Sequence, residues 1–225
     1  HKLNYIIFDK TGTITLGKPI VTDIIKAEEN KKIQIEKTLQ LVGSLETYSE
    51  HPLGEAIVEK IKAEKIKILD VSEFNSITGM GIVGIVEKKS ILVGNIKLMI
   101  KNNIKISQKD KEKIDHLANQ GKTPMLISIE GSFSGIIAVA DPIKESSKKA
   151  IQNLKDMGIK VAMITGDNKK TADAIGKQVG IDIILSEVMP EDKIEEVKKL
   201  QKQGYKVGMV GDGINDAPAL AQANI

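Results

Sequence analysis

The chain of 225 residues contains no cysteine and no tryptophan, and all 33 of its Lys-or-Arg positions are lysines. The absence of cysteine excludes disulfide bonds and thiolate metal sites, and it agrees with a reducing compartment. Only three histidines are present, too few for a soft-metal site, so a transition metal handled by this protein would have to bind elsewhere. The absence of arginine excludes an arginine finger. Lysine, backbone N–H groups and a divalent cation would have to neutralise any transferring phosphoryl group.

Aromatic residues and long apolar runs are also scarce. Three tyrosines and three phenylalanines are all that could stack on bases, and 30 acidic side chains offset the 33 basic ones, so we expect no nucleic-acid partner. The longest apolar runs, such as 136–140, are far shorter than the roughly 20 residues that a helix needs to cross a bilayer. We therefore expect this part of the protein to be soluble. The absence of a signal-peptide pattern and an end just after the helix-like segment 217–223 indicate an excised fragment.

The second half of the chain alternates between helix and strand, which is typical of a parallel sheet. Gly158 and Gly180 mark helix ends, and Pro190 marks a first turn. Helices are predicted at 142–157, 168–179 and 190–203, and strands at 160–164, 183–185 and 206–210.

The middle of the chain shows consecutive strands joined by short turns, which indicates an antiparallel sheet and hence a separate α+β unit inserted into the α/β one. We place the two crossings near Val21 and Ser134. Helices are predicted at 35–48, 52–65, 95–102 and 107–119, and strands at 68–74, 82–87, 90–93, 125–129 and 133–140.

Three polar motifs each follow a predicted apolar strand. They are Asp9–Thr15 (DKTGTIT), Thr165–Asp167 (TGD) and Gly211–Pro218 (GDGINDAP). The carboxyl ends of parallel strands meet at one edge of an open α/β sheet, where such sheets keep their ligands. We therefore predict that Asp9, Asp212 and the Thr165 motif share that edge.

These motifs resemble the phosphorylation-domain signatures of P-type ATPases, ion pumps built on the haloacid dehalogenase fold. The segments Pro190–Lys193 (PEDK) and Ser49–Leu53 (SEHPL) extend the resemblance to essentially the whole chain, and the His-Pro pair is typical of the heavy-metal-transporting branch. The resemblance implies an α/β fold: a haloacid-dehalogenase-like parallel sheet forms the phosphorylation domain, residues 1–20 and 134–225. The inserted α+β antiparallel-sheet unit, residues 21–133, is then the nucleotide-binding domain.

The resemblance also implies roles for the residues at the sheet edge. Asp9 alone could be a loop aspartate that caps a turn, but the full motif favours a nucleophile that attacks the γ-phosphate of ATP to give an acyl phosphate. Asp9, Asp212 and the Thr11 backbone carbonyl would bind Mg²⁺ through hard oxygen atoms. Asn215 and Asp216 would contact phosphate or position the loop, and would also cap the helix after them. The remaining predicted catalytic residues are Lys10, Thr11, Thr165, Gly166, Asp167 and Lys193.

The inserted unit carries the residues that the resemblance assigns to ATP. Glu46 and His51 would contact adenine, although a histidine before proline is also a common helix-entry residue. The glycines of Gly79–Gly84 imitate a dinucleotide fingerprint, but strands follow them rather than the helix which that motif requires. Close backbone approach to the nucleotide is the better reading, with a bulged hairpin as the alternative. The predicted nucleotide site comprises Glu46, His51, Gly79, Gly81, Ile82, Gly94 and Asn95.

Thr11 distinguishes between two classes of enzyme. Many phosphatases of this fold have an aspartate two residues after the nucleophile, which serves as acid and base when the intermediate breaks down. With threonine there, the acyl phosphate should persist, as it must in a pump. A soluble phosphatase is therefore disfavoured, and a nucleotide-sensing module without chemistry stays as a further alternative.

The resemblance finally implies the parent protein. The motifs look most like those of copper(I) exporters, with zinc, cadmium and lead pumps as alternatives, and the expected cofactors are ATP and Mg²⁺. The parent would lie in the cell membrane with this part in the cytoplasm. Its transmembrane, actuator and metal-binding domains, absent from this chain, would be partners, together with a metallochaperone for the parent.

Overall fold

The computed structural model describes residues 3–29, 34–211 and 216–225. The chain divides into two compact units. We call residues 1–18, 119–121 and 141–225 the flanking unit, and residues 19–118 and 122–140 the central unit. Each is described by itself.

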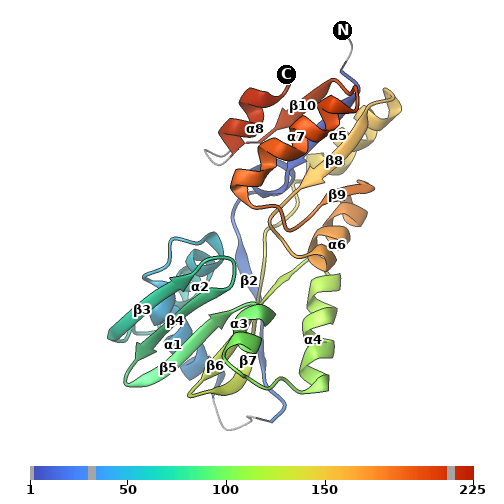
Figure 1. The fold of residues 1–225 in the computed structure, drawn as a ribbon. Coiled ribbons are helices and arrows are strands. Elements are labelled where there is room, and N and C mark those ends of the chain that lie inside the picture. Colours follow the sequence, from blue (N-terminus) through green and yellow to red (C-terminus); the bar gives the residue numbers. More distant parts are fainter. Residues whose placement is uncertain (1–2, 30–33, 212–215) are drawn as a thin grey trace. The chain divides into compact units, whose positions relative to one another are not determined.

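The flanking unit is built on a four-stranded parallel sheet in the order β10-β1-β8-β9. The strands are β1 (Tyr5–Asp9), β8 (Lys160–Ile164), β9 (Ile183–Leu185) and β10 (Val207–Val210). The helices are α5 (Glu145–Asp156), α6 (Lys169–Val179), α7 (Lys193–Lys202) and α8 (Ala217–Gln222) (Figure 1).

Helices cover both faces of this sheet, and two apolar clusters fill the space between the layers. Val197 of α7 and Ala219 of α8 pack with Ile7 of β1 on one side. Ile151 of α5 and Ala172 of α6 pack with other residues of the same sheet on the opposite side. Strands buried on both faces are nearly continuous apolar runs, which is the pattern of this part of the sequence. The predicted α/β fold class is confirmed.

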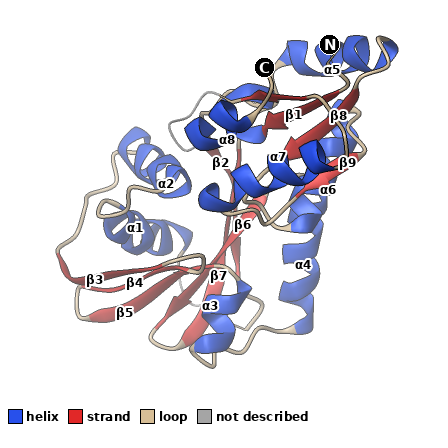
Figure 2. Ribbon diagram, turned by 45° about the horizontal axis from the view of Figure 1, so that its top comes forward, coloured by secondary structure: helices blue, strands red, loops and turns tan. Residues whose placement is uncertain are grey.

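The central unit is built on a six-stranded antiparallel sheet in the order β2-β7-β6-β5-β4-β3. The strands are β2 (Ile20–Lys26), β3 (Val71–Ile77), β4 (Gly81–Val86), β5 (Lys89–Gly94), β6 (Thr123–Ile129) and β7 (Ser132–Ala140). The helices are α1 (Ile35–Glu46), α2 (Pro52–Ala63), α3 (Ile96–Lys101) and α4 (Gln108–Asn119) (Figure 2).

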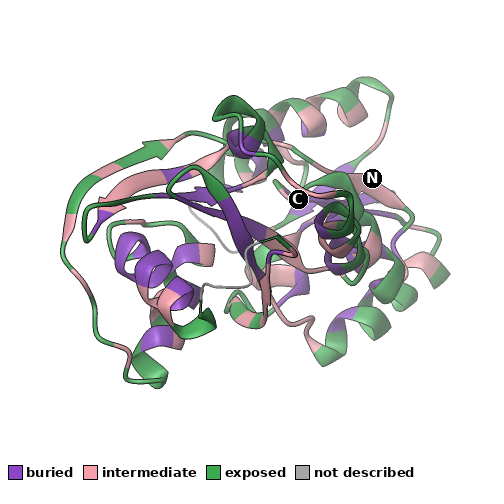
Figure 3. Ribbon diagram, turned by 90° about the horizontal axis from the view of Figure 1, so that it is seen from below, coloured by how far each residue is buried: buried purple, intermediate pink, exposed green. Residues whose placement is uncertain are grey.

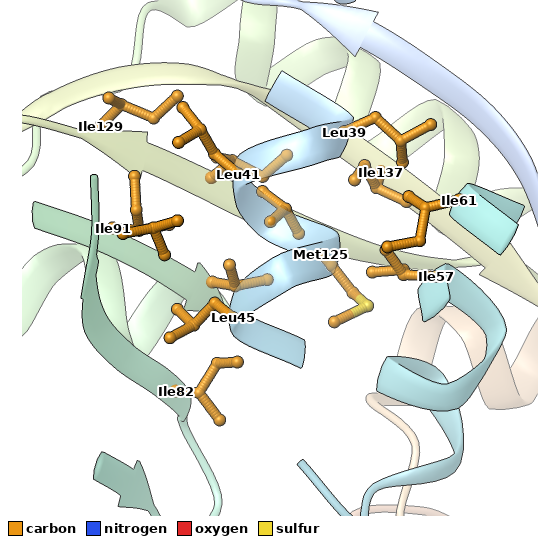
Figure 4. Close-up of a cluster of buried hydrophobic side chains, with 14 of the residues drawn as sticks. Leu39, Leu41, Leu45, Ile57, Ile61, Ile82, Ile91, Met125, Ile129 and Ile137 are labelled. Atoms are coloured by element: carbon orange, nitrogen blue, oxygen red, sulfur yellow. The ribbon is translucent and has the colours of Figure 1, made fainter. Parts of the chain in front are cut away.

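Two apolar clusters also sandwich this sheet. Leu39 and Leu45 of α1 and Ile57 of α2 pack on Ile82 and Ile137, as Figure 4 shows. A second cluster joins residues of α3 and α4 to the other face of the sheet. The helices consequently have a buried side and an exposed side (Figure 3).

Three differences from the sequence-based expectations concern segments that join the two units. β2 was not predicted, and the return crossing lies after Ala140 rather than near Ser134, because β7 pairs with β2 and β6 along its length (Ile20 lies opposite Ala140). The helix expected from Pro142 begins at Glu145, since Ile143 forms an isolated bridge with Thr15. An apolar strand does not reveal its partners, so only the fold could assign residues 134–140.

Candidate functional site

Asp9 is the last residue of β1, at the carboxyl edge of the parallel sheet. β1 lies between β10 and β8, and Asp9 is opposite Ile164, which directly precedes Thr165. A single turn, Lys10–Ile14, follows, and Gly12 within it has φ of 73°, a conformation that favours glycine. The turn directs the chain away from the sheet and leaves the Asp9 carboxylate buried at its edge.

Lys193, at the start of α7, joins two buried carboxylates. Its Nζ donates to Asp9 Oδ1 at 2.6 Å and to Asp216 Oδ1 at 2.7 Å. Burial raises the pKa of Asp9, and the Lys193 ammonium acts in the opposite direction. Burial acts to lower the pKa of Lys193, but its hydrogen bonds to Asp216 and Asp9 outweigh that effect and raise it. The arrangement places a charged ammonium against the predicted nucleophile.

A second ion pair lies at the same edge. Lys10 Nζ donates to Asp167 Oδ2 at 2.6 Å, and the Thr165 hydroxyl donates to the same oxygen at 3.1 Å. The Asp167 N–H in turn donates to Thr165 Oγ1 at 3.1 Å. A Cβ added at Gly166 would meet ordinary packing, 3.6 Å from the Val188 carbonyl oxygen, so space alone does not require glycine there.

The predicted magnesium ligands are described only in part. Asp212 and Asn215 lie outside the described residues. In the remaining chain no group of three or more His, Cys, Asp or Glu residues could hold a metal ion. Asp9 and Asp216 nevertheless supply carboxylate oxygens, the donor type that Mg²⁺ prefers. A Cβ on Gly211 would lie 2.5 Å from Asp216 Oδ2, so glycine there leaves room for that carboxylate.

Glu46 is the last residue of α1 in the central unit, and its side chain is buried. Burial raises its pKa to about 7, opposed by a hydrogen bond from the Ser49 hydroxyl. The His51 N–H donates to Ser49 Oγ at 3.2 Å, so Ser49 connects the two residues predicted to contact adenine. A buried acid that changes charge near neutral pH is typical of functional sites.

His51 is the N-cap of α2, and its exposed ring accepts a hydrogen bond from the Leu53 N–H through Nδ1 at 3.2 Å. Pro52 follows in the first turn. The helix-entry reading of His51 therefore holds in the structure.

The predicted glycine and asparagine residues gather where β4 and β5 begin and end. A Cβ on Gly81 would lie 2.2 Å from the Val93 carbonyl oxygen, and one on Gly94 would lie 2.2 Å from the Met80 carbonyl oxygen. Both glycines thus allow two chain segments to approach closely. Asn95 caps α3 and donates from Nδ2 to the Gly79 carbonyl oxygen at 2.8 Å.

The remaining predicted residue, Ile82 of β4, packs against α1. Ile82 is buried in the same apolar cluster as Leu45, which directly precedes Glu46 (Figure 4). At Gly79, where φ is 69°, an added Cβ would meet nothing within 4 Å among the described atoms. The positive φ of Gly79 therefore favours glycine, and the space beside its Cα is open.

A family model of haloacid dehalogenase-like hydrolases matches residues 3–224. The solved catalytic domain of the CPx-ATPase CopB-B, in a study of its conformational changes upon nucleotide binding, is 31% identical with a TM-score of 0.71. The match covers 99% of this chain and 79% of that one. This chain belongs to the haloacid dehalogenase-like hydrolases, among the catalytic domains of P-type ATPases.

Longer proteins that match this P-type ATPase catalytic chain are themselves named as P-type ATPases. A copper-exporting P-type ATPase of Staphylococcus aureus (strain JH9) is 48% identical over the whole chain, which spans 27% of that relative's length. A zinc-transporting PIB-type ATPase in its E2.Pi state is 33% identical with a TM-score of 0.67, covering 100% of this chain and 35% of that one. Among the described residues, no helix has both the length and the apolar character that a membrane span requires.

Two residues that hold the Asp9 turn and the segment after it in this P-type ATPase chain, Lys144 and Asp141, were not predicted from the sequence. The Asp141 carboxylate accepts from Thr15 Oγ1 at 2.5 Å, from the Gly17 N–H at 3.2 Å and from the Lys18 N–H at 3.1 Å. Lys144 Nζ donates to the Gly12 carbonyl oxygen. The DPIK run at Asp141–Lys144 was the available signal, but the helix was predicted to begin at Pro142, directly after Asp141.

Proposed function

We propose that this chain transfers the γ-phosphoryl group of ATP to Asp9 and stores it there as an acyl phosphate. The observation that carries the proposal is the Lys193 ammonium, bound to both Asp9 and Asp216 at the carboxyl edge of the parallel sheet. A buried carboxylate with an adjacent cation suits both parts of the reaction. The carboxylate is the nucleophile, and the cation offsets the negative charge of the incoming phosphoryl group.

In the proposed step, an oxygen of the Asp9 carboxylate attacks the γ-phosphorus, the bond from that phosphorus to the β,γ-bridging oxygen breaks, and ADP leaves. Lys193 orients the carboxylate and remains charged, because its pKa is raised. The Thr165 hydroxyl and the Gly166 N–H would hold phosphoryl oxygens, while Lys10 and Asp167 keep the two loops together. Mg²⁺, held by Asp9, Asp212 and the Thr11 carbonyl, would supply charge neutralisation.

Thr11 supports storage of the phosphoryl group rather than its immediate release. It has no carboxyl group to activate water, so the chain provides no general base at the position where a phosphatase of this fold has one. We expect slow hydrolysis of the acyl phosphate and no rapid turnover of simple phosphate monoesters. Rapid monoester turnover would favour the phosphatase alternative instead.

ATP would bind to the central unit, with adenine at Glu46 and His51 and close backbone approach at Gly79 and Gly81. The support is the buried acid linked to His51 through Ser49, and the open face at Gly79. A carboxylate can accept a hydrogen bond from the 6-amino group of adenine, and an imidazole can stack on the ring.

Covalent labelling tests the proposal directly. Asp9→Asn should abolish acid-stable, hydroxylamine-labile labelling from γ-labelled ATP, because the amide is a poor nucleophile, and it should leave ATP binding largely intact. Asp182→Asn is the matched control, since Asp182 is an exposed aspartate that pairs with Lys155 at 2.8 Å in the same unit. Wild-type labelling in Asp9→Asn would contradict the assignment, and binding without any label would favour a nucleotide-sensing module.

For the longer parent protein we propose copper(I) transport across the cell membrane, coupled to this phosphorylation. The support is the 48% identity to a relative named as a copper-exporting P-type ATPase. Zinc, cadmium and lead are the alternatives, since a solved neighbour is zinc-transporting. The parent's transmembrane, actuator and metal-binding domains and a metallochaperone would be partners, with this part in the cytoplasm. Comparing copper(I) with zinc as stimulators of the parent's ATPase activity tests the choice of metal.

A further inference from the structure

The buried carboxyl group of Glu46 lies beside the first turn of a helix to which it does not belong. A Cβ built on Gly54 of α2 would be 2.3 Å from Glu46 Oε2 and 3.1 Å from its Cδ. Real Cβ atoms essentially never approach another atom within 3.0 Å. The missing side chain of Gly54 therefore provides the space that the Glu46 carboxyl group fills.

The stability of the fold alone gives little reason to put an acid at this position. Glu46 ends α1, where the helix dipole disfavours negative charge, and burial adds a desolvation cost that raises its pKa. Two features compensate in part: the Ser49 hydroxyl donates to the carboxylate, and the first turn of α2, with the positive end of its dipole, lies alongside. The same Ser49 hydroxyl oxygen, which accepts from the His51 N–H, would lie 3.1 Å from the added Cβ.

We propose that Gly54 and Ser49 are positioning residues of the nucleotide site, which hold the Glu46 carboxyl group where it recognises the adenine base. The proposal rests on the proposed function, in which Glu46 contacts adenine. Any side chain at position 54 displaces the end of the Glu46 side chain, which is flexible enough to move without unfolding α2. Alanine also has the higher helix propensity, so Gly54→Ala should weaken ATP binding without weakening the fold.

The test is a double-mutant cycle on the whole 225-residue chain, with ATP affinity measured by calorimetry and the melting temperature recorded for each variant. Loss of a hydrogen bond to a charged group predicts that Glu46→Ala weakens ATP binding on the order of tenfold. Gly54→Ala should give a similar loss at an unchanged or higher melting temperature, and Ser49→Ala a smaller one. In the Glu46→Ala background, Gly54→Ala should change the affinity by less than about twofold, because the group that it displaces is gone.

Gly43→Ala is the matched control. A Cβ on Gly43 of α1 would lie 2.7 Å from the Ile61 side chain of α2, so this variant crowds the packing of the same two helices through apolar atoms. It should alter the melting temperature and leave ATP affinity unchanged.

The outcomes separate this inference from the function on which it rests. If wild type does not bind ATP, or Glu46→Ala binds as tightly as wild type, then the proposed nucleotide site fails and this inference fails with it. If Glu46→Ala loses affinity but Gly54→Ala does not, only the positioning role is overturned. An equal loss on adding Gly54→Ala to Glu46→Ala would also overturn it, since Gly54 would then act by another route.

Discussion

Replacing Lys193 with methionine tests the electrostatic reasoning at the sheet edge. Methionine keeps an unbranched side chain and removes the ammonium that lies 2.6 Å from Asp9 and 2.7 Å from Asp216. The lysine side chain is only 10% exposed, so water screens this interaction little. The variant leaves two buried carboxylates without their shared cation.

The expected cost follows from the burial of both partners. Breaking a buried ion pair by removing one member costs about 3–5 kcal/mol, and one ammonium serves two carboxylates here, so we expect about 4 kcal/mol at pH 8. The loss should shrink in acid. Without Lys193 the pKa of Asp9, which burial already raises, should rise further, so the folded variant holds a proton that the unfolded chain releases. Its stability deficit should therefore fall, by up to about 1.4 kcal/mol per pH unit, as the pH decreases from 8 to 5.

Urea unfolding followed by circular dichroism between pH 5 and pH 8 measures this deficit. Lys198→Met is the control on the same helix, because Lys198 is 39% exposed and pairs with Glu195 across one turn. An exposed pair of this kind should contribute no more than about 0.5 kcal/mol. A deficit below about 1 kcal/mol for Lys193→Met at pH 8, or one that does not change with pH, would refute the reasoning. Labelling from γ-labelled ATP should also be largely lost in Lys193→Met.

Two further predictions concern the carboxyl groups of Glu46 and Asp141. Wild type should lose up to about 3 kcal/mol of stability relative to Glu46→Gln as the pH rises from 5 to 8, because burial raises the Glu46 pKa from 4.5 to about 7 and the ionised carboxylate is then buried in the folded state. Thermal unfolding of both proteins at both pH values measures this difference, and parallel pH profiles would contradict it. Asp141→Ala should cost about 2 kcal/mol and slow the labelling of Asp9, because the carboxylate accepts three hydrogen bonds from the segment after the Asp9 turn. For Asp141→Ala, a labelling rate equal to that of wild type would show that the turn is positioned without it.

Much of the flanking unit could be predicted from local pattern. β8 and β9 have the predicted bounds, and Asn168 and Gly180 begin and end α6 as a cap and a left-handed terminus. Those signals are local, since capping and apolar periodicity involve residues a few positions apart. The prediction that Asp9 and Thr165 share an edge is confirmed by the parallel register of β1 and β8, while Asp212 lies outside the described residues.

Contacts between distant segments were harder to predict. β2 was missed, and residues 134–140 were assigned to the wrong unit, because strand pairing joins Ile20 to Ala140 across more than a hundred residues. Asp141 was overlooked for the same reason, since its partners lie at Thr15, Gly17 and Lys18.

The amino-acid sequence alone determined the family, the two kinds of sheet and the identity of the candidate nucleophile, since each depends on short motifs and on the spacing of apolar residues. Only the tertiary structure decided which charges meet. It brought Lys193 to both Asp9 and Asp216, and it placed Gly54 against Glu46. The physical reason is that hydrogen bonds and steric exclusion act over a few ångströms in space, and only the folded chain brings distant residues within that range.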